Sequence, residues 1–497
     1  MLHTALLLGV ALHVRPPTPG CARPAPRCRA SRLFLATEQQ IGDDFFAAVL
    51  STRAAESRAA ESADLAQLRE EATEALSGTE RPGRKDEAWR RTDLSLLFAS
   101  SFAPPPGAAA HHVRALIAGD DDGDDGARVV FVDGVFDGSL SDVSTLPDGV
   151  LAGRLADVRA VVAADASSAL LSCMRSLPES GADPRTELGC YALAALNQAG
   201  LADIGCIYVP RGVAVTKPLR AVFVSTAPTV EAEALEPGAE RTFAVSHPNL
   251  LVWLEEGSEL ELYQRYVGTG CSFTNALTRL ELGARSTLRH AYVQEQDMSA
   301  VHLEQLVATV GAGSLYASQA VQLGSRISRL NLGVQLAGSG AATELEGLTL
   351  GAERQLLDVH SKVSHLAPDC VSSQEQRNAL AGRARVVFKG AVFVPIGSDN
   401  TTANQLCRSL LLSDTARVDV QPTLEILTDE VGRPKKMKTR KKTRKMVLKK
   451  TNRLTKQQVY FPARVEAKCP NGKLHKHPSL LPMRKKKVVL VLHGVQS

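Results

Sequence analysis

Apolar residues recur at helical spacing between residues 41 and 78, most clearly in the run ADLAQLREEATEAL at 63–76. Its leucines and alanines fall on one face while Glu, Arg and Gln fill the other, which predicts an amphipathic helix. A second helix is predicted for ELGCYALAALNQAGLA at 187–202, and a short strand for VVFVDGVF at 129–136. We therefore expect the first part of the chain to be a helical or mixed region.

The pattern changes near residue 204, where short alternating or β-branched runs begin, separated by glycine. Such runs predict strands joined by tight turns. Turns at Gly257, Gly283, Gly311 and Gly338 follow one another at nearly even intervals, with apolar strands on both sides. A steady period in the twenties without helices is typical of a β-solenoid. A two-sheet sandwich is the alternative, because hairpin spacing can imitate such a period.

Composition and charge refine this division. Apolar residues make up 44% of the 497 residues and aromatic residues only 4%, so the core must consist mainly of aliphatic side chains. The net charge of +5 hides opposite regions: residues 1–36 hold five Arg and no acid, and residues 432–497 hold 21 Lys and Arg and one acid. The body between 37 and 431 has a net charge of −20. Since nucleic-acid binders carry basic surfaces, no nucleic acid is expected as a partner of this body.

Four segments result from these patterns. They are a targeting segment (1–36), a helical or mixed N-terminal region (37–203), a solenoid core (204–431) and a basic low-complexity tail (432–497).

The targeting segment has two parts. LHTALLLGVAL (2–12) has the length of a signal-peptide core and is too short to anchor in a membrane, so no membrane is expected as a partner. The Arg-, Pro- and Ala-rich stretch after it resembles the transit sequences of algal plastids surrounded by extra membranes. Nine scattered cysteines without a C-x-x-C favour a reducing compartment. We expect the plastid stroma; a secretory signal with a disordered linker is the alternative.

Several catalytic patterns are absent from the sequence. It contains no G-x-x-x-x-G-K-[ST], no H-E-x-x-H and no G-x-S-x-G. The acidic run D-D-D-G-D-D (120–125) lacks the spaced ligands and closing Glu of an EF-hand, so a solvated loop is expected there. We therefore expect no nucleotide site and no enzymatic activity in this chain.

Thiol and imidazole groups are the remaining candidates for metal chemistry. His360, His365 and Cys370 follow one another at intervals of five, and residues i and i+5 of one strand face opposite sides. One strand cannot offer all three to an ion, but neighbouring coils about 4.8 Å apart could bring such residues together. We take Cys407, His360 and Cys370 as candidate metal ligands. The alternatives are polar ladder or turn histidines and small buried cysteines.

Several stretches resemble, in order, the SufD subunit of the SUF iron–sulfur cluster assembly complex. The R-K-D-E-A-W motif at 84–89 points to SufD rather than to its paralogue SufB. The matching stretches are GRKDEAWRRTDLSLL (83–97), ALNQAGLADIGCIYVPRGVAVTKPL (195–219), HPNLLVWLEEGSELELYQRYVG (247–268), FTNALTRLELGA (273–284), RARVVFKGAVFV (383–394) and RSLLLSDTARVDVQPTLEI (408–426).

The resemblance implies a fold and a role. The fold would be a right-handed parallel β-helix after a helical N-terminal region, normally followed by a helical C-terminal domain. The role would be a non-catalytic scaffold that pairs with SufB, while the separate SufC subunit hydrolyses ATP. An iron–sulfur cluster would form transiently at the interface with SufB, where thiolate and imidazole suit iron. In SufB a cysteine precedes an S-[ML]-L strand, and Cys407 precedes such a run here, either by accident or as an additional ligand.

The sequence departs from the family after LEILTDEV (424–431), where GRPKKMKTRKKTRK replaces a C-x-H-G motif and the helical domain that docks SufC. Docking of SufC is therefore in doubt. A retained intron would explain the change, because every valine codon begins with GT, the dinucleotide that opens most introns, and Val431 stands at the break. A genuine disordered tail is the alternative.

Two other classes of function stay open at this point. A polysaccharide-active enzyme on a β-helix would need clustered carboxylates on one face, whereas the acids here are dispersed. A nucleic-acid- or membrane-binding protein would act through the basic tail.

Overall fold

The computed structural model describes residues 44–53, 62–118, 126–179, 188–228 and 241–427, and the backbone of two short strands at 445–446 and 459–466. The targeting segment, the acidic loop 120–125 and the rest of the basic tail lie outside the described residues. The expectations for them stay predictions.

Helices dominate the region before residue 200, as the spacing of apolar residues predicts. The helix α3 begins and ends where the run ADLAQLREEATEAL does, and the Ser62 hydroxyl caps it by accepting the backbone N–H of Leu65 at 3.3 Å. None of the helices in the described ranges has the length and apolar character that a membrane crossing demands. The helices are α2 (Asp44–Leu50), α3 (Ala63–Leu76), α4 (Ser95–Phe98), α5 (Ala110–Ile117), α6 (Leu155–Val161), α7 (Ala164–Arg175) and α8 (Tyr191–Ala199).

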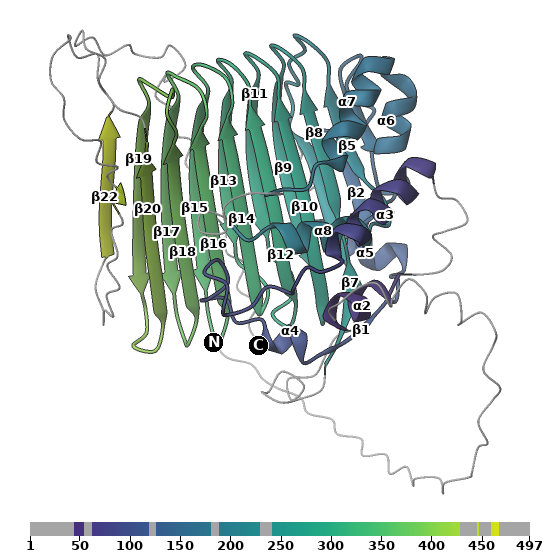
Figure 1. Ribbon diagram of the computed structural model, residues 1–497. Helices are drawn as coiled ribbons and strands as arrows, with labels where there is room; N and C mark the ends of the chain where they lie inside the picture. Colours follow the sequence, from purple (N-terminus) through teal and green to yellow (C-terminus); the bar gives the residue numbers. More distant parts are fainter. Residues whose placement is uncertain are drawn as a thin grey trace, which may run out of the picture. The chain divides into compact units, whose positions relative to one another are not determined.

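Two facing sheets hold the strands, and from β8 to β20 successive strands alternate between them (Figure 1). From β8 onward, each pair of consecutive strands forms one coil of a β-solenoid, and six such coils run from β8–β9 to β18–β19. Sheet A contains β4 (Leu151–Arg154), β5 (Gly205–Val209), β8 (Asn249–Leu254), β10 (Ser272–Leu282), β12 (Val301–Val310), β14 (Ile327–Leu336), β16 (Leu356–His365), β18 (Arg385–Val394) and β20 (Arg417–Ile426), with β7 (Thr242–Ser246) beside β10 and β1 (Ser101–Ala103) beside β7. Sheet B contains β3 (Val135–Phe136), β2 (Arg128–Val132), β6 (Leu219–Ser225), β9 (Glu259–Gly268), β11 (Thr287–Gln294), β13 (Leu315–Gln322), β15 (Ala342–Gly351), β17 (Val371–Leu380) and β19 (Thr402–Leu411).

Neighbouring strands of the solenoid are parallel, each paired with a strand one coil further on. Asn249 of β8 pairs with Leu277 of β10, and Arg385 of β18 pairs with Arg417 of β20. Hairpins would make neighbouring strands antiparallel, so the parallel ladder confirms the solenoid and excludes the sandwich. Strands β2, β3 and β4 of the N-terminal region extend the two sheets beyond the predicted start of the core near residue 204.

Three of the four predicted glycine turns stack on one another. A Cβ added to Gly283 or Gly311 would lie 2.7 Å from a backbone atom of the preceding coil, and one added to Gly338 would lie 2.1 Å from it. Only glycine allows the coils to approach so closely at this position.

Gly257 belongs to a different column, two positions further along the turn. Because Glu259 pairs with Thr287, Gly257 lies beside Arg285 and not beside Gly283. This second column adopts the left-handed conformation, with φ of 71° at Gly257, 57° at Arg285, 65° at Gly313 and 70° at Gly340. The prediction that Gly257 and Gly283 are equivalent positions of the repeat is therefore wrong, because the two have different backbone conformations. The residue equivalent to Gly257 in the next coil is Arg285.

Replacing Gly311 with alanine is expected to lower the free energy of unfolding by about 1–3 kcal/mol. The new methyl would meet the carbonyl oxygen of Leu282 at 2.7 Å, and a backbone oxygen within a ladder cannot move aside as a flexible side chain can. Gly83→Ala is the control, because its Cβ would meet nothing nearer than 3.9 Å. Urea denaturation of both variants measures the difference, and equal stabilities would contradict the close stacking.

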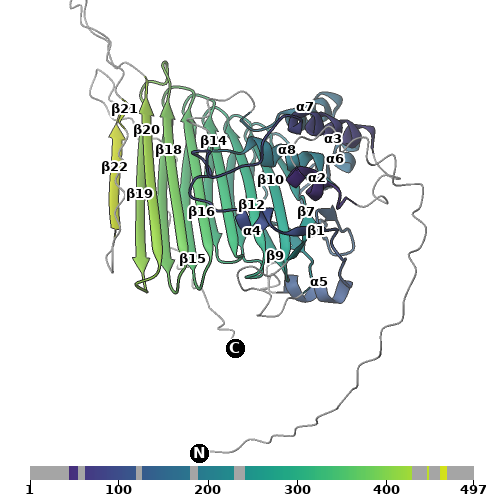
Figure 2. The ribbon, with the colours of Figure 1, turned by 60° about the horizontal axis from the view of Figure 1, so that its bottom comes forward.

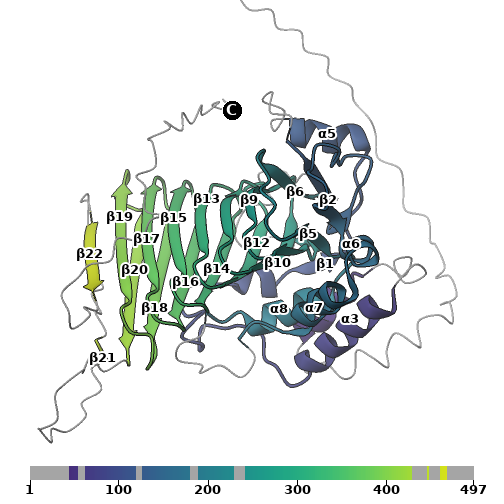
Figure 3. The same ribbon diagram turned by 90° about the horizontal axis from the view of Figure 1, so that it is seen from above.

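Helices cover the first coils on both sides. On sheet A, α8 packs against β10, and the Asn197 side-chain amide donates to the carbonyl oxygens of Pro248 and Asn275 at 2.8 and 2.7 Å. On sheet B, α5 packs on β6 and β9 through Val113 and Ile117. Figures 2 and 3 show these helices gathered at the first coils, with no described helix over β15, β17 or β19.

The interior of the solenoid contains an aromatic stack and a polar ladder as well as aliphatic residues. Phe131 and Tyr266 stack on either side of Phe223 with ring centroids 4.9 Å apart in each pair. In the later coils the Gln374 amide donates to the Ser361 hydroxyl at 2.6 Å, so polar side chains satisfy one another inside the solenoid.

Two short strands are described in the basic tail. β22 (Val459–Glu466) pairs with β19, and β21 (Lys445–Met446) pairs with the end of β20. Both pairings are antiparallel, in contrast to the parallel ladder of the solenoid.

Candidate functional site

The predicted ligand His360 lies on β16, on the outer face of sheet A, and it is 3% exposed. The Arg329 Nη2 group donates to His360 Nδ1 at 2.9 Å, so the ring proton is on Nε2, which lies 3.2 Å from Asp358 Oδ1. Burial and the Arg329 guanidinium lower the pKa of His360 to about 4, against the opposite effect of Asp358. Both ring nitrogens are thus engaged, and the ring is neutral at neutral pH.

Arg329 is the centre of this cluster and is fully buried. Its guanidinium lies 3.6 Å from the centroid of the Trp89 ring, in a cation–π contact. Burial alone would raise the pKa of Asp358, but His360 and Arg329 outweigh it and hold the pKa below its ordinary value. The remaining bonds of Arg329 go to the carbonyl oxygens of Ala88 and Leu188 and to the Thr92 hydroxyl, all at 2.8 Å, to Asn331 Oδ1 at 2.9 Å and to Asp358 Oδ2 at 3.3 Å.

This cluster fixes the segment that contains the R-K-D-E-A-W motif to the solenoid. Trp89 contacts Arg329 of β14, and the Thr92 hydroxyl donates to Asp358 of β16. Arg91 Nη1 lies 3.1 Å from Asp419 Oδ1 of β20. The motif therefore has a structural role here: it covers the outer face of the later coils of sheet A.

Cys407 lies on β19 with its side chain in the solenoid interior. It is 3% exposed and packs with Val359, Phe388 and Val420, and the Asn378 amide donates to its sulfur at 3.6 Å. Burial raises the pKa of the Cys407 thiol to about 11. In this state the thiol resembles a small apolar side chain more than a metal ligand.

Cys370 lies in the turn before β17 and is also fully buried. Its thiol lies 3.5 Å from the carbonyl oxygen of Gly338, and burial raises its pKa to about 11. Cys370 and Cys407 are thus interior residues, whereas His360 lies on the outer face of the other sheet. Within the described ranges, no three His, Cys, Asp or Glu side chains form a group that could hold a metal ion.

The two interior thiols are expected to resist alkylation in the folded protein. A thiol with a pKa of about 11 is only about 0.1% thiolate at pH 8, and burial also blocks access of the reagent. Iodoacetamide should therefore label Cys370 and Cys407 at least about 100-fold more slowly in buffer than in urea, as peptide mass spectrometry would show. Fast labelling of Cys407 in buffer would contradict its interior position.

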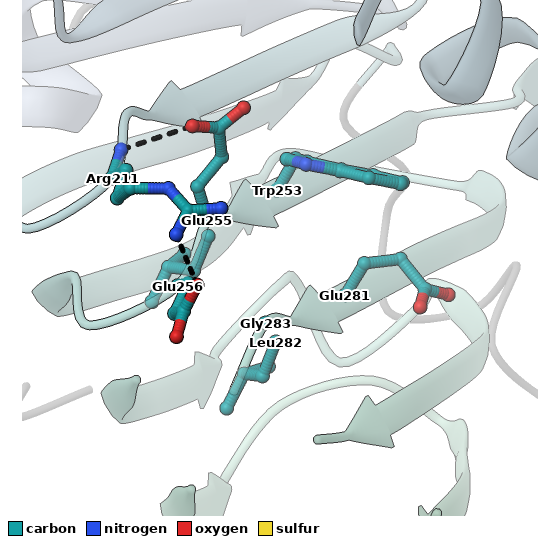
Figure 4. A pocket seen from close by; sticks show the side chains of 8 residues that line it. Arg211, Trp253, Glu255, Glu256, Glu281, Leu282 and Gly283 are labelled. Carbon is teal, nitrogen blue, oxygen red and sulfur yellow. Dashed lines mark hydrogen bonds and ion pairs between the residues drawn. The ribbon is translucent and has the colours of Figure 1, made fainter. Parts of the chain in front are cut away.

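A shallow pocket of about 310 Å³ lies where β8 and β10 end, on the outer side of sheet A (Figure 4). Trp253 forms one wall, and Glu256 is paired with both Arg211 and Arg285. Burial raises the pKa of Glu281, whose carboxylate accepts the Thr309 hydroxyl at 3.2 Å. The eight lining residues include no Ser, Cys or His that could act as a nucleophile or a base.

The sequence analysis missed Arg329 and Asp358. Their signal is present in the runs R-L-N (329–331) and D-V-H (358–360), where polar residues alternate with apolar ones on a predicted strand. The alternation places Arg329, Asp358 and His360 on one face, and the pairing of Arg329 with Asp358 aligns them.

Comparison with known families agrees with these features. The model of the SUF system FeS cluster assembly SufBD core domain matches residues 237–434, and that of the SufBD protein N-terminal region matches residues 44–221. The chain belongs to the SufBD family. The match to the SufBD core ends at residue 434, so nearly all of the basic tail lies outside it.

Several curated proteins are similar to this chain, and two of the three described here are named as iron–sulfur cluster assembly proteins. The protein ABCI7, chloroplastic, of Arabidopsis thaliana is 29% identical over 74% of this chain and 73% of its own length. An iron–sulfur cluster assembly SufBD family protein of Synechocystis is 26% identical over 74% of this chain and 78% of its own. The iron–sulfur cluster assembly protein SufD of Plasmodium falciparum is 25% identical over 38% of this chain, which is 13% of that protein. These relatives are consistent with a SufD-type member of the SufBD family.

Proposed function

We propose that this chain is a non-catalytic scaffold subunit of iron–sulfur cluster assembly in the plastid stroma. It pairs with a SufB-type paralogue and works with a separate SufC-type ATPase. The observation that carries the proposal is the match of the SufBD core to residues 237–434, which spans the solenoid from β7 to β20. The name of the Synechocystis relative supports the pathway, and the name of the Arabidopsis relative, which is called chloroplastic, supports the plastid.

The last coil of the solenoid supports a partner at this end. Apolar side chains are exposed there, with Leu410 47% and Leu412 63% exposed at the end of β19, and Ile396 81% exposed in the turn before it. Leu410 and Leu412 lie two residues apart at one end of β19, whereas Ile396 lies at the other end, and exposed apolar side chains at an uncovered coil are typical of a protein interface. On β20 only Val420 is buried, in contrast to the strands of the earlier coils.

Co-purification with a SufB-type paralogue tests the pairing. The double variant Leu410→Glu/Leu412→Glu should lose the paralogue, because two carboxylates would be buried in the interface. Val161→Glu on α6 is the matched control, since Val161 is 70% exposed at the opposite end of the solenoid. Equal recovery of the paralogue by both variants would place the interface elsewhere.

The role of Cys407, His360 and Cys370 as ligands of the transient cluster stays a proposal. All three are buried in the isolated chain, so iron could reach them only after the later coils open. Partner binding that strains these coils would achieve this. Faster alkylation of Cys407 in the assembled complex with ATP than in the isolated chain would support such opening, and unchanged protection would count against it.

We propose further that the chain as written binds a SufC-type ATPase weakly, because the basic tail stands where the docking domain is expected. Sequencing cDNA across the codons for residues 420–440 decides between a retained intron and a genuine tail. If a spliced form exists, it should recover SufC in a pull-down that the present form fails. Equal recovery by both forms would contradict this proposal.

A further inference from the structure

Glu304 is a buried carboxyl group inside the solenoid. It lies on β12 between Ala276 and Leu330 of the neighbouring strands, and it is 0% exposed. Residues of the same strand parity, such as Leu306 and Ala308, belong to the interior core, so Glu304 also points inward. Neither carboxyl oxygen has a hydrogen-bond partner of normal geometry among the described residues.

Only neutral polar groups face this carboxyl. The Gln264 amide donates to the hydroxyls of Tyr266 and Thr278, both at 2.9 Å, which leaves the two hydroxyl hydrogens free to turn toward Glu304. His302 Nε2 lies 2.9 Å from the Tyr292 hydroxyl and 3.8 Å from Glu304 Oε2. The titratable groups around Glu304 are Tyr266 of β9, His290 and Tyr292 of β11, His302 of β12 and Tyr316 of β13.

No positive charge compensates an ionised Glu304 among these described neighbours. Burial lowers the pKa of His302 to about 3, so its ring is neutral at physiological pH. Burial raises the pKa of Glu304 to about 7, against the lowering effect of the Tyr266 and Thr278 hydroxyls. A carboxyl group with this environment holds its proton to a higher pH than a glutamic acid in water does.

We propose that Glu304 is a proton-binding site in the solenoid interior, which holds the coils from β9 to β12 closed when occupied and loosens them when the proton is lost. The opened coil exposes Glu304 to water, where it ionises as an ordinary glutamic acid. Rising pH between 4.5 and 7 therefore favours the opened coil. Asn275 on β10 also bonds the Leu193 carbonyl oxygen of α8 at 2.9 Å, so opening at this place weakens the attachment of the helical region.

Hydrogen exchange of the peptides that cover β10 and β12 tests the proposal, in the full chain and in Glu304→Gln. The glutamine has nearly the same shape but no proton to lose. His290 and His302 affect the pH dependence of opening equally in both proteins, so their effect cancels in the comparison. The ratio of the opening constants, wild type over variant, should rise about 30-fold between pH 5.5 and 8. The matched control is Glu346→Gln on β15, an exposed carboxylate, for which the ratio should not change with pH. A ratio for Glu304→Gln that is independent of pH would overturn the proposal.

Infrared spectroscopy of the wild-type chain gives an answer even if the variant does not fold. A protonated carboxylic acid has a carbonyl stretch that a carboxylate lacks. We expect a component that is present at pH 6.5 and lost with a midpoint near pH 7. Without a component that titrates near neutral pH, Glu304 does not hold a proton and the proposal fails.

Discussion

Replacing Arg329 with methionine is expected to lower the free energy of unfolding by about 3–5 kcal/mol. Methionine fills a similar volume, but it leaves Asp358 as a buried charge without its cation. It also leaves the carbonyl oxygens of Ala88 and Leu188 without a donor, and each unsatisfied buried group adds to the loss. The segment around Trp89 should then separate from sheet A before the solenoid itself unfolds.

Urea denaturation followed by tryptophan fluorescence measures this effect, because Trp89 stacks on Arg329. Arg289→Met on β11 is the control; Arg289 is exposed, so the change should be below about 0.5 kcal/mol. Adding Asp358→Asn to Arg329→Met should restore part of the stability, since the unpaired charge is then removed. If Arg329→Met loses less than about 1 kcal/mol, the cluster does not hold the N-terminal segment as we describe.

Mild acid should unfold the chain. Five buried histidines have lowered pKa values because burial disfavours their charged form: about 3 for His290 and His302, and about 4 for His247, His360 and His365. In the unfolded chain they protonate near pH 6.5, so the stability they contribute is complete above that pH and is lost below it. Below pH 6.5 each histidine lowers the free energy of unfolding by about 1.4 kcal/mol for every pH unit. By pH 5 the five together offset most of the roughly 5–15 kcal/mol by which a typical domain is stable.

Glu304 and Asp133 act in the opposite sense. Burial raises their pKa values to about 7 and about 6, so their protonation stabilises the folded state as the pH falls toward 4. Burial raises the pKa values of Asp203 and Glu281 as well, but the five histidines have the larger combined effect, and circular dichroism should show cooperative unfolding between pH 6 and 4.5. His302→Gln should move the midpoint to lower pH, whereas His111→Gln, at an exposed position, should not. A fold that persists at pH 4 would contradict the lowered pKa values.

The solenoid could be predicted from the sequence because its turns repeat a physical requirement. Glycine recurs where one coil touches the next, so the period is visible at Gly283, Gly311 and Gly338. The assignment of Gly257 failed because glycine also serves the left-handed position further along the turn, which Arg285 occupies in the next coil. A pattern of glycines cannot separate these two causes without the strand register.

The predicted ligands show where sequence reasoning ends. Residue type made His360, Cys370 and Cys407 candidates, but burial decides their chemistry, and burial depends on distant parts of the chain. His360 is covered by the segment of Trp89 and Thr92, which lies far earlier in the sequence and is held there through Arg329. A single Glu in an alternating strand is expected on the solvent side, whereas Glu304 occupies an inward position.

The family match argues against the two other classes of function. A polysaccharide-active enzyme and a tail-dependent binding protein were both compatible with a basic-tailed solenoid. The SufBD models match the N-terminal region and the solenoid alike, while the tail contributes almost nothing to the match. We therefore base the proposed function on residues 44–434.

Native mass spectrometry after co-expression with a SufB-type paralogue tests the central claim most directly. The chain should form a one-to-one complex with the paralogue, and iron and sulfide added anaerobically should build a cluster on that complex but not on the chain alone. A chain that stays unpaired, or that assembles a cluster or hydrolyses ATP by itself, would contradict the scaffold function.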